Sequence, residues 1–148
     1  MGEETVHATA VLVGNRAALI RGPAGSGKTR LALALIDAAH TGALPFARLV
    51  ADDRVRLSVA HGRLIAAAPD TIRGLAEVRG LGIRTLPYEA RAVVGLVVDL
   101  AAADAARVAA EAGREIVILG VTLPRLAVAA GREPLPMVLG RATTLARA

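Results

Sequence analysis

The sequence predicts an α/β fold in which helices flank a mixed sheet. Three features predict this class. A glycine-rich phosphate-binding motif at residues 22–29 lies between a strand-like segment and a helix-like segment. Helix-like and strand-like segments also alternate along the chain. Finally, the stretch 55–100 is rich in strand patterns, which departs from a plain doubly wound fold and indicates a mixed sheet.

Length and composition restrict the class of protein. With 148 residues, we expect a single domain over 1–148 with a sizeable core and no separate N-terminal domain. Hydrophobic residues make up 54% of the chain, yet no uncharged apolar run approaches the roughly 20 residues that a membrane span needs. The chain has no cysteine, which excludes disulfides and thiolate metal sites. Its N-terminus has no apolar signal core, so we expect a cytoplasmic protein.

The net charge of +5 does not by itself indicate nucleic acid as a partner. The arginines are spread along the chain, and Phe46 and Tyr88 are the only aromatic residues, so a stacking surface for bases is not predicted. A local excess of arginine near the glycine-rich motif (Arg16, Arg21 and Arg30) and in residues 73–91 favours an anionic ligand or an acidic partner surface.

The N-terminal segments lead into the motif. Residues 6–13 alternate as in a strand, Gly14 and Asn15 form a hairpin signal, and residues 17–20 predict a short buried strand. His7 lies at the start of this hairpin. A lone histidine is more often an ordinary surface or core residue than a catalyst, so both interpretations stay open.

The motif fits the pattern G-x-x-x-x-G-K-[ST] at every fixed position, with the residues Gly22, Pro23, Ala24, Gly25, Ser26, Gly27, Lys28 and Thr29. Its glycines allow the backbone to turn tightly and to aim N–H groups at phosphate oxygens where the following helix, from residue 30, begins. We expect Lys28 to reach the terminal phosphates and Thr29 to bind Mg²⁺. Lys28 is the only lysine in the chain, which places a compact charge where a phosphate ligand needs it.

A second candidate site follows the apolar segment 47–51, which ends in Asp52 and Asp53. P-loop folds place a strand of this kind beside the phosphate loop, where one aspartate contacts Mg²⁺ directly or through water. The alternative is a solvated turn, because Asp-Asp-Arg is common in turns.

The remaining segments complete the predicted alternation. Residues 55–59 and 63–67 predict two short strands joined by a turn at 60–62, where His61 is expected as a turn residue. The glycine-rich stretch 72–83 carries Glu77 and Arg79 among apolar residues, which indicates charges that need partners. Further on, the expected elements are a strand at 93–100, a helix at 102–112, a strand at 115–119 and a terminal helix at 135–148.

Four of these features together resemble the catalytic domain of HPr kinase/phosphorylase: His7 in the first strand, the phosphate loop, the segment 50–53, and the glycine-rich segment 75–83. The resemblance runs from about His7 to Arg132. It implies a P-loop variant akin to phosphoenolpyruvate carboxykinase, commonly assembled as hexamers. It also implies a serine kinase that uses ATP, or pyrophosphate, with Mg²⁺. The implied substrate is HPr, the phosphocarrier protein of the phosphotransferase system, and inorganic phosphate reverses the reaction and releases pyrophosphate.

The resemblance also implies roles for particular residues. His7 resembles the family's active-site histidine, Lys28 its phosphate-binding lysine, and Asp53 the residue that takes the seryl proton and returns it in reverse. Thr29 and Glu77 would hold Mg²⁺.

Two later positions match the family's pattern less closely. Arg107 matches its active-site arginine, with Arg114 as the alternative. Gly131 and Arg132 match a late Pro-Gly-Arg-Asn element linked to dephosphorylation, with Ala130 in place of the proline and Glu133 in place of the asparagine. The chain resembles the short form found in some proteobacteria, without the long C-terminal helix that helps to engage HPr.

Two other functions stay open from the sequence. One is a regulatory module that senses ATP or phosphate without transferring phosphate, which the altered late element and the missing C-terminal helix favour. The other is a P-loop kinase for a small metabolite. The presence of His7, Lys28, Asp53 and Glu77 favours the protein kinase.

Overall fold

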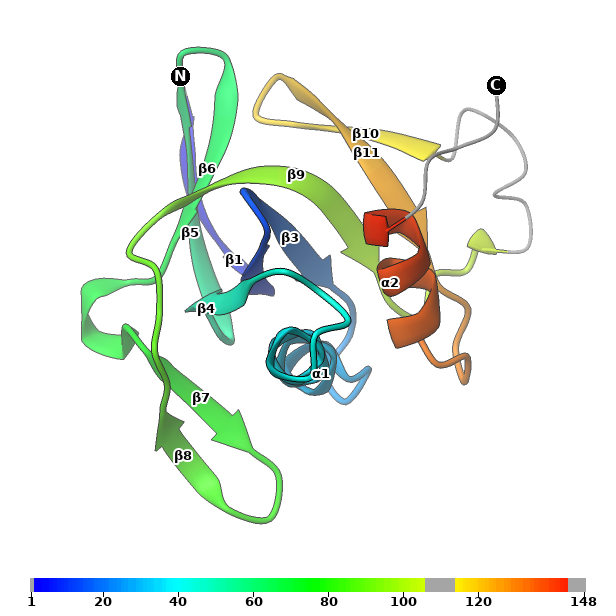
Figure 1. Ribbon diagram of the computed structural model, residues 1–148. Helices are drawn as coiled ribbons and strands as arrows, with labels where there is room; N and C mark the ends of the chain where they lie inside the picture. The colour runs from blue at the N-terminus through cyan, green and yellow to red at the C-terminus, as the bar shows by residue number, and fades with distance from the viewer. Residues whose placement is uncertain (1, 106–113, 144–148) are drawn as a thin grey trace.

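The structure is a computed structural model that describes residues 2–105 and 114–143 (Figure 1). Its elements in chain order are β1 (Glu3–His7), β2 (Thr9–Val13), β3 (Arg16–Arg21), α1 (Lys28–His40), β4 (Ala47–Ala51), β5 (Arg54–Ala60), β6 (Arg63–Ala67), the 3-10 helix η1 (Asp70–Ile72), β7 (Leu75–Val78), β8 (Gly82–Thr85), β9 (Ala92–Asp99), β10 (Glu115–Ile118), β11 (Val121–Ala127) and α2 (Leu135–Thr143). Within these ranges, neither helix is long and apolar enough to cross a membrane.

Nine of the strands form one mixed sheet, as the sequence predicts. Seven of them are ordered β1-β5-β6-β9-β3-β2-β4. Of the other two, β11 pairs with β9, and β10 pairs with β11. The strands β3, β9 and β11 run parallel, whereas the other pairings in this sheet are antiparallel. β9 pairs with β3 along one edge and with β6 and then β11 along the other, so its two ends belong to different parts of a curled sheet (Figure 1).

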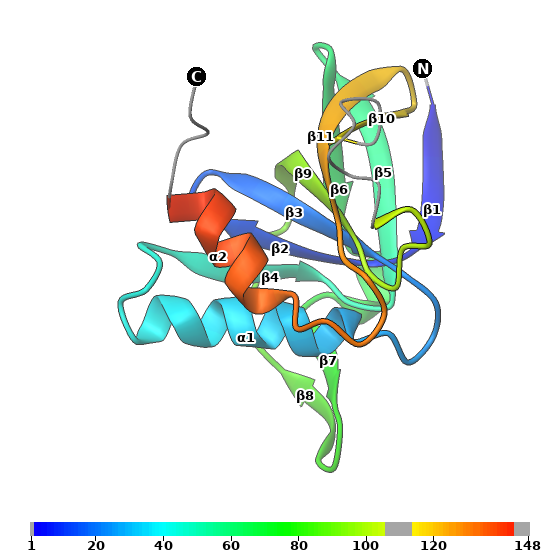
Figure 2. The same ribbon diagram turned by 90° about the vertical axis from the view of Figure 1, so that its right-hand side faces the viewer.

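The alternation of β3 divides the core between the two faces of the sheet. Ala18 and Ile20 pack in a cluster with Leu31 and Leu35 of α1 and with residues of α2. Leu19 points the opposite way, into a second cluster formed by the curled strands. Both helices therefore cover the same face of the sheet, as Figure 2 shows, and α1 lies directly against the strands that carry the phosphate loop.

Most of the expected elements are present, and two differ from expectation. The predicted strand 6–13 is broken at Ala8, so His7 ends β1 rather than starting a hairpin strand. The break occurs because β1 pairs with β5 whereas β2 pairs with β3 and β4, and the Ala8 N–H donates to the Asp53 carbonyl at 3.2 Å. Of the predicted helix 102–112, the described part, 102–105, forms turns, and the rest lies outside the described residues.

The predicted terminal helix is present as α2, whose described part ends at Thr143. The strand β11 was not expected from the sequence, since Pro124 interrupts an otherwise strand-like segment. The glycine-rich stretch forms the hairpin of β7 and β8, which projects away from the body of the protein in both Figures 1 and 2.

The packing of α1 gives a test of the fold. Leu35 has no exposed surface, so we expect Leu35→Ala to lower the free energy of unfolding by about 2–5 kcal/mol through lost apolar contact and a residual cavity. Leu81→Ala removes the same atoms from a side chain that is 63% exposed, and should change stability by less than about 0.5 kcal/mol. Chemical denaturation of both variants measures the difference, and equal losses would contradict the burial of this helix face.

Candidate active site

The phosphate loop connects the end of β3 to the first residue of α1. The loop closes on itself through a hydrogen bond from the Ser26 N–H to the Pro23 carbonyl at 3.1 Å. Gly27 precedes the helix with a φ of 100° and no side-chain cap, a left-handed conformation that suits glycine. The first N–H groups of α1 therefore have no capping side chain and can donate to an anion.

Gly22 at the start of the loop cannot be replaced without displacing its neighbours. A Cβ at this position would lie 2.5 Å from Ser26 Oγ and 3.2 Å from the Leu100 carbonyl oxygen. The loop thus packs directly against the residue that follows β9. Among the described residues, Ser26 Oγ is a buried polar atom without a hydrogen-bond partner, as expected for a group whose partner is a ligand.

Lys28 points back into the loop that precedes it. Its Nζ donates to the carbonyls of Gly22 at 2.8 Å and Pro23 at 3.1 Å, and the residue is only 8% exposed. The ammonium group is therefore held inside the loop, where phosphate oxygens would bind. Phosphate fits this site because the loop offers an ammonium group, a hydroxyl without a partner and uncapped helix N–H groups.

Asp52 is the centre of the site. Its Oδ1 accepts hydrogen bonds from Thr29 Oγ1 at 2.7 Å and Thr9 Oγ1 at 2.9 Å, and its Oδ2 accepts one from the Glu77 N–H at 3.2 Å. The residue is 5% exposed, so it is not the solvated turn that the sequence left open. Three elements far apart in the chain thus converge on one carboxylate.

A magnesium ion fits the oxygen atoms gathered here. The Thr29 hydroxyl donates its proton to Asp52, which leaves the lone pairs of its oxygen available to a metal ion. Hydroxyl and carboxylate oxygens are the ligands that Mg²⁺ prefers, usually alongside waters and substrate phosphates. Within residues 2–105 and 114–143, no group of three or more metal-binding side chains forms a cage made by the protein alone.

Asp53 lies beside this centre and faces the solvent. It has a φ of 69°, a left-handed conformation that Asp tolerates, and the Arg54 N–H closes the turn onto the Asp52 carbonyl at 2.8 Å. The Asp53 side chain is 69% exposed and its Oδ1 lies 3.5 Å from His7 Nδ1. The turn therefore separates two adjacent carboxylates, one buried in the site and one accessible to a substrate.

The remaining predicted residues are placed as follows. Glu77 contributes its backbone N–H to Asp52, while its side chain is exposed. Arg107 lies outside the described residues, and Arg114 is exposed just before β10. Gly131 and Arg132 lie in the exposed turn before α2, which Glu133 ties to the first turn of α1 through its ion pair with Arg30 at 3.3 Å.

A cluster of four charged side chains joins the ends of the three parallel strands. Arg21, immediately before the phosphate loop, donates to both oxygens of Asp99 at 2.7 and 2.8 Å. Arg125 donates to Asp99 at 2.6 Å and to both oxygens of Asp104 at 2.9 and 3.0 Å. The expectation that Arg21 and Arg30 serve an anionic ligand is therefore not supported, because both are paired with carboxylates of the chain itself.

The cluster shifts the pKa values of its members. Burial on its own would raise the pKa of Asp99, but the hydrogen bonds and charges of Arg21 and Arg125 outweigh burial and hold this pKa below its ordinary value of 3.8. The hydrogen bonds from Arg125 to Asp104 raise the pKa of Arg125 further above its ordinary range, against the opposing effect of burial. Both side chains stay charged at neutral pH and hold the strand ends beside the phosphate loop.

Comparison with known proteins assigns the chain to a family. Residues 1–138 match the sequence profile described as the HPr Serine kinase C-terminal domain. The chain belongs to this family. It is 41% identical over 85 residues to an HPr kinase/phosphorylase of Clostridium tetani, covering 57% of this chain and 26% of that protein. It is 37% identical over 134 residues to an HPr kinase/phosphorylase of Geobacillus thermodenitrificans, covering 83% of this chain and 41% of that protein.

A solved structure supports the assignment of this chain to the same family. The Hpr(Ser) kinase/phosphatase from Coxiella burnetii superposes with a TM-score of 0.75 at 25% identity, covering 94% of this chain and 93% of the other. The P-loop variant fold predicted from the resemblance is thereby confirmed. The chain spans less than half the length of the two curated relatives, the proteins from Clostridium tetani and Geobacillus thermodenitrificans.

Sequence reasoning missed three residues of the site. Thr9 has no exposed surface and donates to Asp52, but one threonine in a strand gives no signal by itself. Asp99 and Arg125 form the charged cluster. A carboxylate at the end of the predicted strand 93–100 was the available signal for Asp99, since parallel strands end at the same edge as the phosphate loop.

The charged cluster predicts how stability depends on pH. The pKa of Asp99 is lower in the folded state than in the unfolded state. The ionised carboxylate therefore adds to the free energy of unfolding above pH 3.8, and this contribution is lost as the pH falls through the pKa of the folded state. We expect Asp99→Asn to lower the free energy of unfolding by about 2 kcal/mol at pH 7, since the partly buried guanidinium groups of Arg21 and Arg125 lose a shared partner. This deficit relative to the wild type should shrink below pH 3.8, as measured by urea denaturation across pH.

Asp70→Asn is the matched control for this experiment. Asp70 pairs with Arg73 at 2.9 Å, but its side chain is 74% exposed, so water screens the interaction. Its replacement should cost less than about 1 kcal/mol at any pH. A deficit for Asp99→Asn that is no larger than this control would show that the cluster does not hold the strand ends.

Proposed function

We propose that this chain is the catalytic domain of an ATP-dependent serine kinase that phosphorylates an HPr-like phosphocarrier protein. The observation that carries the proposal is the pair of carboxylates at the end of β4. Asp52 is buried and hydrogen-bonded to the phosphate-loop residue Thr29, whereas the next residue, Asp53, is exposed and close to His7. One carboxylate is suited to a metal and the other to a proton from an incoming hydroxyl.

The phosphate loop supports the binding half of this proposal. Lys28 Nζ, the partnerless hydroxyl of Ser26 and the N–H groups at the start of α1 would bind the phosphates of ATP or pyrophosphate. Thr29 and Asp52, with Glu77 beside them, would hold Mg²⁺, which when bound neutralises charge on the phosphate groups.

Asp53 supports the chemical half. A seryl hydroxyl is a poor nucleophile, so transfer needs a base within reach of its proton. The serine oxygen forms a bond to the terminal phosphorus, the bond to the bridging oxygen breaks, and Asp53 accepts the hydroxyl proton. His7, whose Nδ1 lies 3.5 Å from Asp53, would orient the carboxylate and share that proton.

The same groups can work in reverse with inorganic phosphate. A phosphate oxygen would bond to the phosphorus of the phosphoserine, the serine oxygen would leave with the proton from Asp53, and pyrophosphate would form. Arg107 is proposed as the active-site arginine for either direction. Glu133 stands where the family has asparagine, and it pairs with Arg30 in the first turn of α1. Because the family's element is linked to dephosphorylation, we expect this change to affect the reverse direction in particular.

The partner and the setting are proposed from the relatives. Proteins named HPr kinase/phosphorylase match in sequence, and the protein that matches in structure is named Hpr(Ser) kinase/phosphatase. We accordingly propose an HPr-like protein as substrate, a cytoplasmic location and a homo-oligomer, with the hexamer of the resembling family as the expected form.

Replacement of Asp53 tests the proposal most directly. We expect Asp53→Ala to lower transfer of labelled γ-phosphate from Mg-ATP to the HPr-like protein of the same organism by about 10²–10⁴-fold. ATP affinity should stay nearly unchanged, because the side chain is 69% exposed and outside the phosphate loop. Transfer is followed by autoradiography and affinity by calorimetry.

Two controls complete the experiment. Lys28→Ala should weaken nucleotide binding together with transfer, since its ammonium lies inside the phosphate loop. Asp70 is exposed and far from the phosphate loop in the chain, so Asp70→Ala should change neither nucleotide binding nor phosphate transfer. Unchanged transfer in Asp53→Ala would remove this residue from the mechanism. Nucleotide binding by the wild type without transfer to any HPr-like protein would instead favour a nucleotide-sensing regulatory module.

A further inference from the structure

The outer strand and the turn of the β7–β8 hairpin are uncovered. Every residue of β8 is exposed, and Leu81 in the turn and Ile83 in the strand are each 63% exposed. A two-stranded hairpin is marginally stable in water unless another surface packs against it. Large aliphatic side chains gathered at the tip of such a hairpin indicate an interaction surface.

Two positive charges accompany these aliphatic side chains. Arg79 and Arg84 are exposed, and no ion pair or hydrogen bond of their side chains is formed within the part of the chain that the structure describes. We call the four side chains of Arg79, Leu81, Ile83 and Arg84 the hairpin tip. It combines two aliphatic groups with two positive charges, so its complement is an apolar hollow with an acidic rim.

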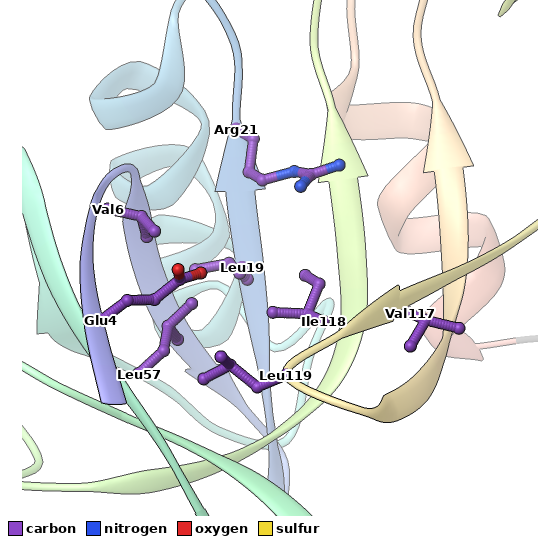
Figure 3. Close-up of a pocket in the computed structure, with 8 residues that line it drawn as sticks. All are labelled: Glu4, Val6, Leu19, Arg21, Leu57, Val117, Ile118 and Leu119. Atoms are coloured by element: carbon purple, nitrogen blue, oxygen red, sulfur yellow. The ribbon is translucent and has the colours of Figure 1, made fainter. Parts of the chain in front are cut away.

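The structure contains a hollow of this kind at the gap between β1 and the β10–β11 turn (Figure 3). Its volume is about 270 Å³, and Val6, Leu57, Val117 and Leu119 contribute its apolar wall. Pockets for drug-sized molecules start near 300 Å³, so this hollow suits one or two aliphatic side chains better than a large ligand. Val117 is 63% exposed at its mouth, which leaves apolar surface uncovered on this side as well.

Negative charge borders the hollow. Glu4 lines it, and Glu115 lies two residues from Val117 on the same face of β10. Both are exposed and form no ion pair within the described ranges. Arg21 also reaches the hollow, but its charge is bound to Asp99 in the bidentate pair. Among the lining side chains, Glu4 therefore carries the charge that no partner in the described ranges neutralises.

The hairpin tip and the hollow cannot meet within one chain. In both Figure 1 and Figure 2 the hairpin projects from one end of the protein, while β1 and the β10–β11 turn lie toward the other. Surfaces that are complementary but far apart on one molecule fit a head-to-tail contact between copies, which closes into a ring or continues as a filament.

We propose that the hairpin tip of one copy docks into the hollow between β1 and β10 of a second copy. Leu81 and Ile83 fill the apolar hollow, and Arg79 and Arg84 face Glu4 and Glu115 on its rim. This assignment needs neither ATP nor a protein substrate, so it stands or falls separately from the proposed phosphate transfer.

The contact would link the sites of neighbouring copies. The root of the hairpin holds Asp52 through the Glu77 N–H, and the receiving hollow is bordered by Arg21, the residue before the phosphate loop. Each hairpin thus extends from the carboxylate centre of its own copy to the strand that carries the phosphate loop of the next.

Cysteine pairing tests the contact directly, because the chain has no cysteine of its own. Leu81→Cys and Val117→Cys variants, mixed under mild oxidation without nucleotide, should form a mixed disulfide dimer in at least about tenfold greater yield than Leu81→Cys mixed with His61→Cys. His61 is an exposed residue of a different hairpin turn, between β5 and β6, and so controls for random collision. Equal yields in the two mixtures would overturn the proposal.

Sedimentation equilibrium gives the second measurement. The wild type should associate in a salt-dependent manner, and Leu81→Arg should weaken association at least about tenfold. Its thermal unfolding, measured at a dilution at which the wild type is monomeric, should match that of the wild type. Arg84→Glu and Glu4→Arg should each weaken association, and the double variant should recover part of it. A wild type that stays monomeric at high concentration would overturn the proposal, as would a Leu81→Arg variant that associates normally and loses only transfer to the HPr-like protein.

Discussion

The carboxylate of Asp52 is the point on which the arrangement of the site depends. It joins β2 through Thr9, α1 through Thr29 and β7 through the Glu77 N–H. Each of these bonds is made to a charged acceptor largely removed from water, so it is stronger than an ordinary surface hydrogen bond. Replacement of this side chain by one without acceptor oxygens would leave the phosphate loop, the hairpin and the β1–β2 break without a common anchor.

The sharp turn after Asp52 explains how two neighbouring carboxylates have opposite environments. Asp53 has a left-handed conformation and its side chain faces the solvent, whereas the side chain of Asp52 is buried. The Ala8 N–H holds the Asp53 carbonyl, and His7 therefore arrives next to the exposed carboxylate. The break in the N-terminal strand and the turn at the end of β4 are consequently one structural feature, made by two segments more than 40 residues apart in the chain.

This feature also marks the limit of what the sequence predicts. The phosphate loop could be placed from its glycines and Lys28, since local spacing fixes both the turn and the following helix. The pair Asp52 and Asp53 could be found from its position after an apolar segment, but its division into a buried and an exposed member goes with long-range contacts, such as those of Thr9 with Asp52 and of Ala8 with Asp53. Long-range contacts of this kind leave no periodic signal. For the same reason Arg21 was expected to face a ligand, whereas the parallel register of β3 and β9 places it opposite Asp99.

The inward position of Lys28 has a consequence for how the loop selects its ligands. The ammonium group donates to the loop's own carbonyls of Gly22 and Pro23, and these two contacts help to hold the shape of the loop. An incoming anion must replace these internal contacts, and a single phosphate offers fewer oxygens for the exchange than linked phosphates do. A chain of linked phosphates replaces them and reaches the helix N–H groups and Thr29 as well. The loop is thus preorganised for polyphosphates, whose linked oxygens gain more contacts from this exchange than the oxygens of a single phosphate do.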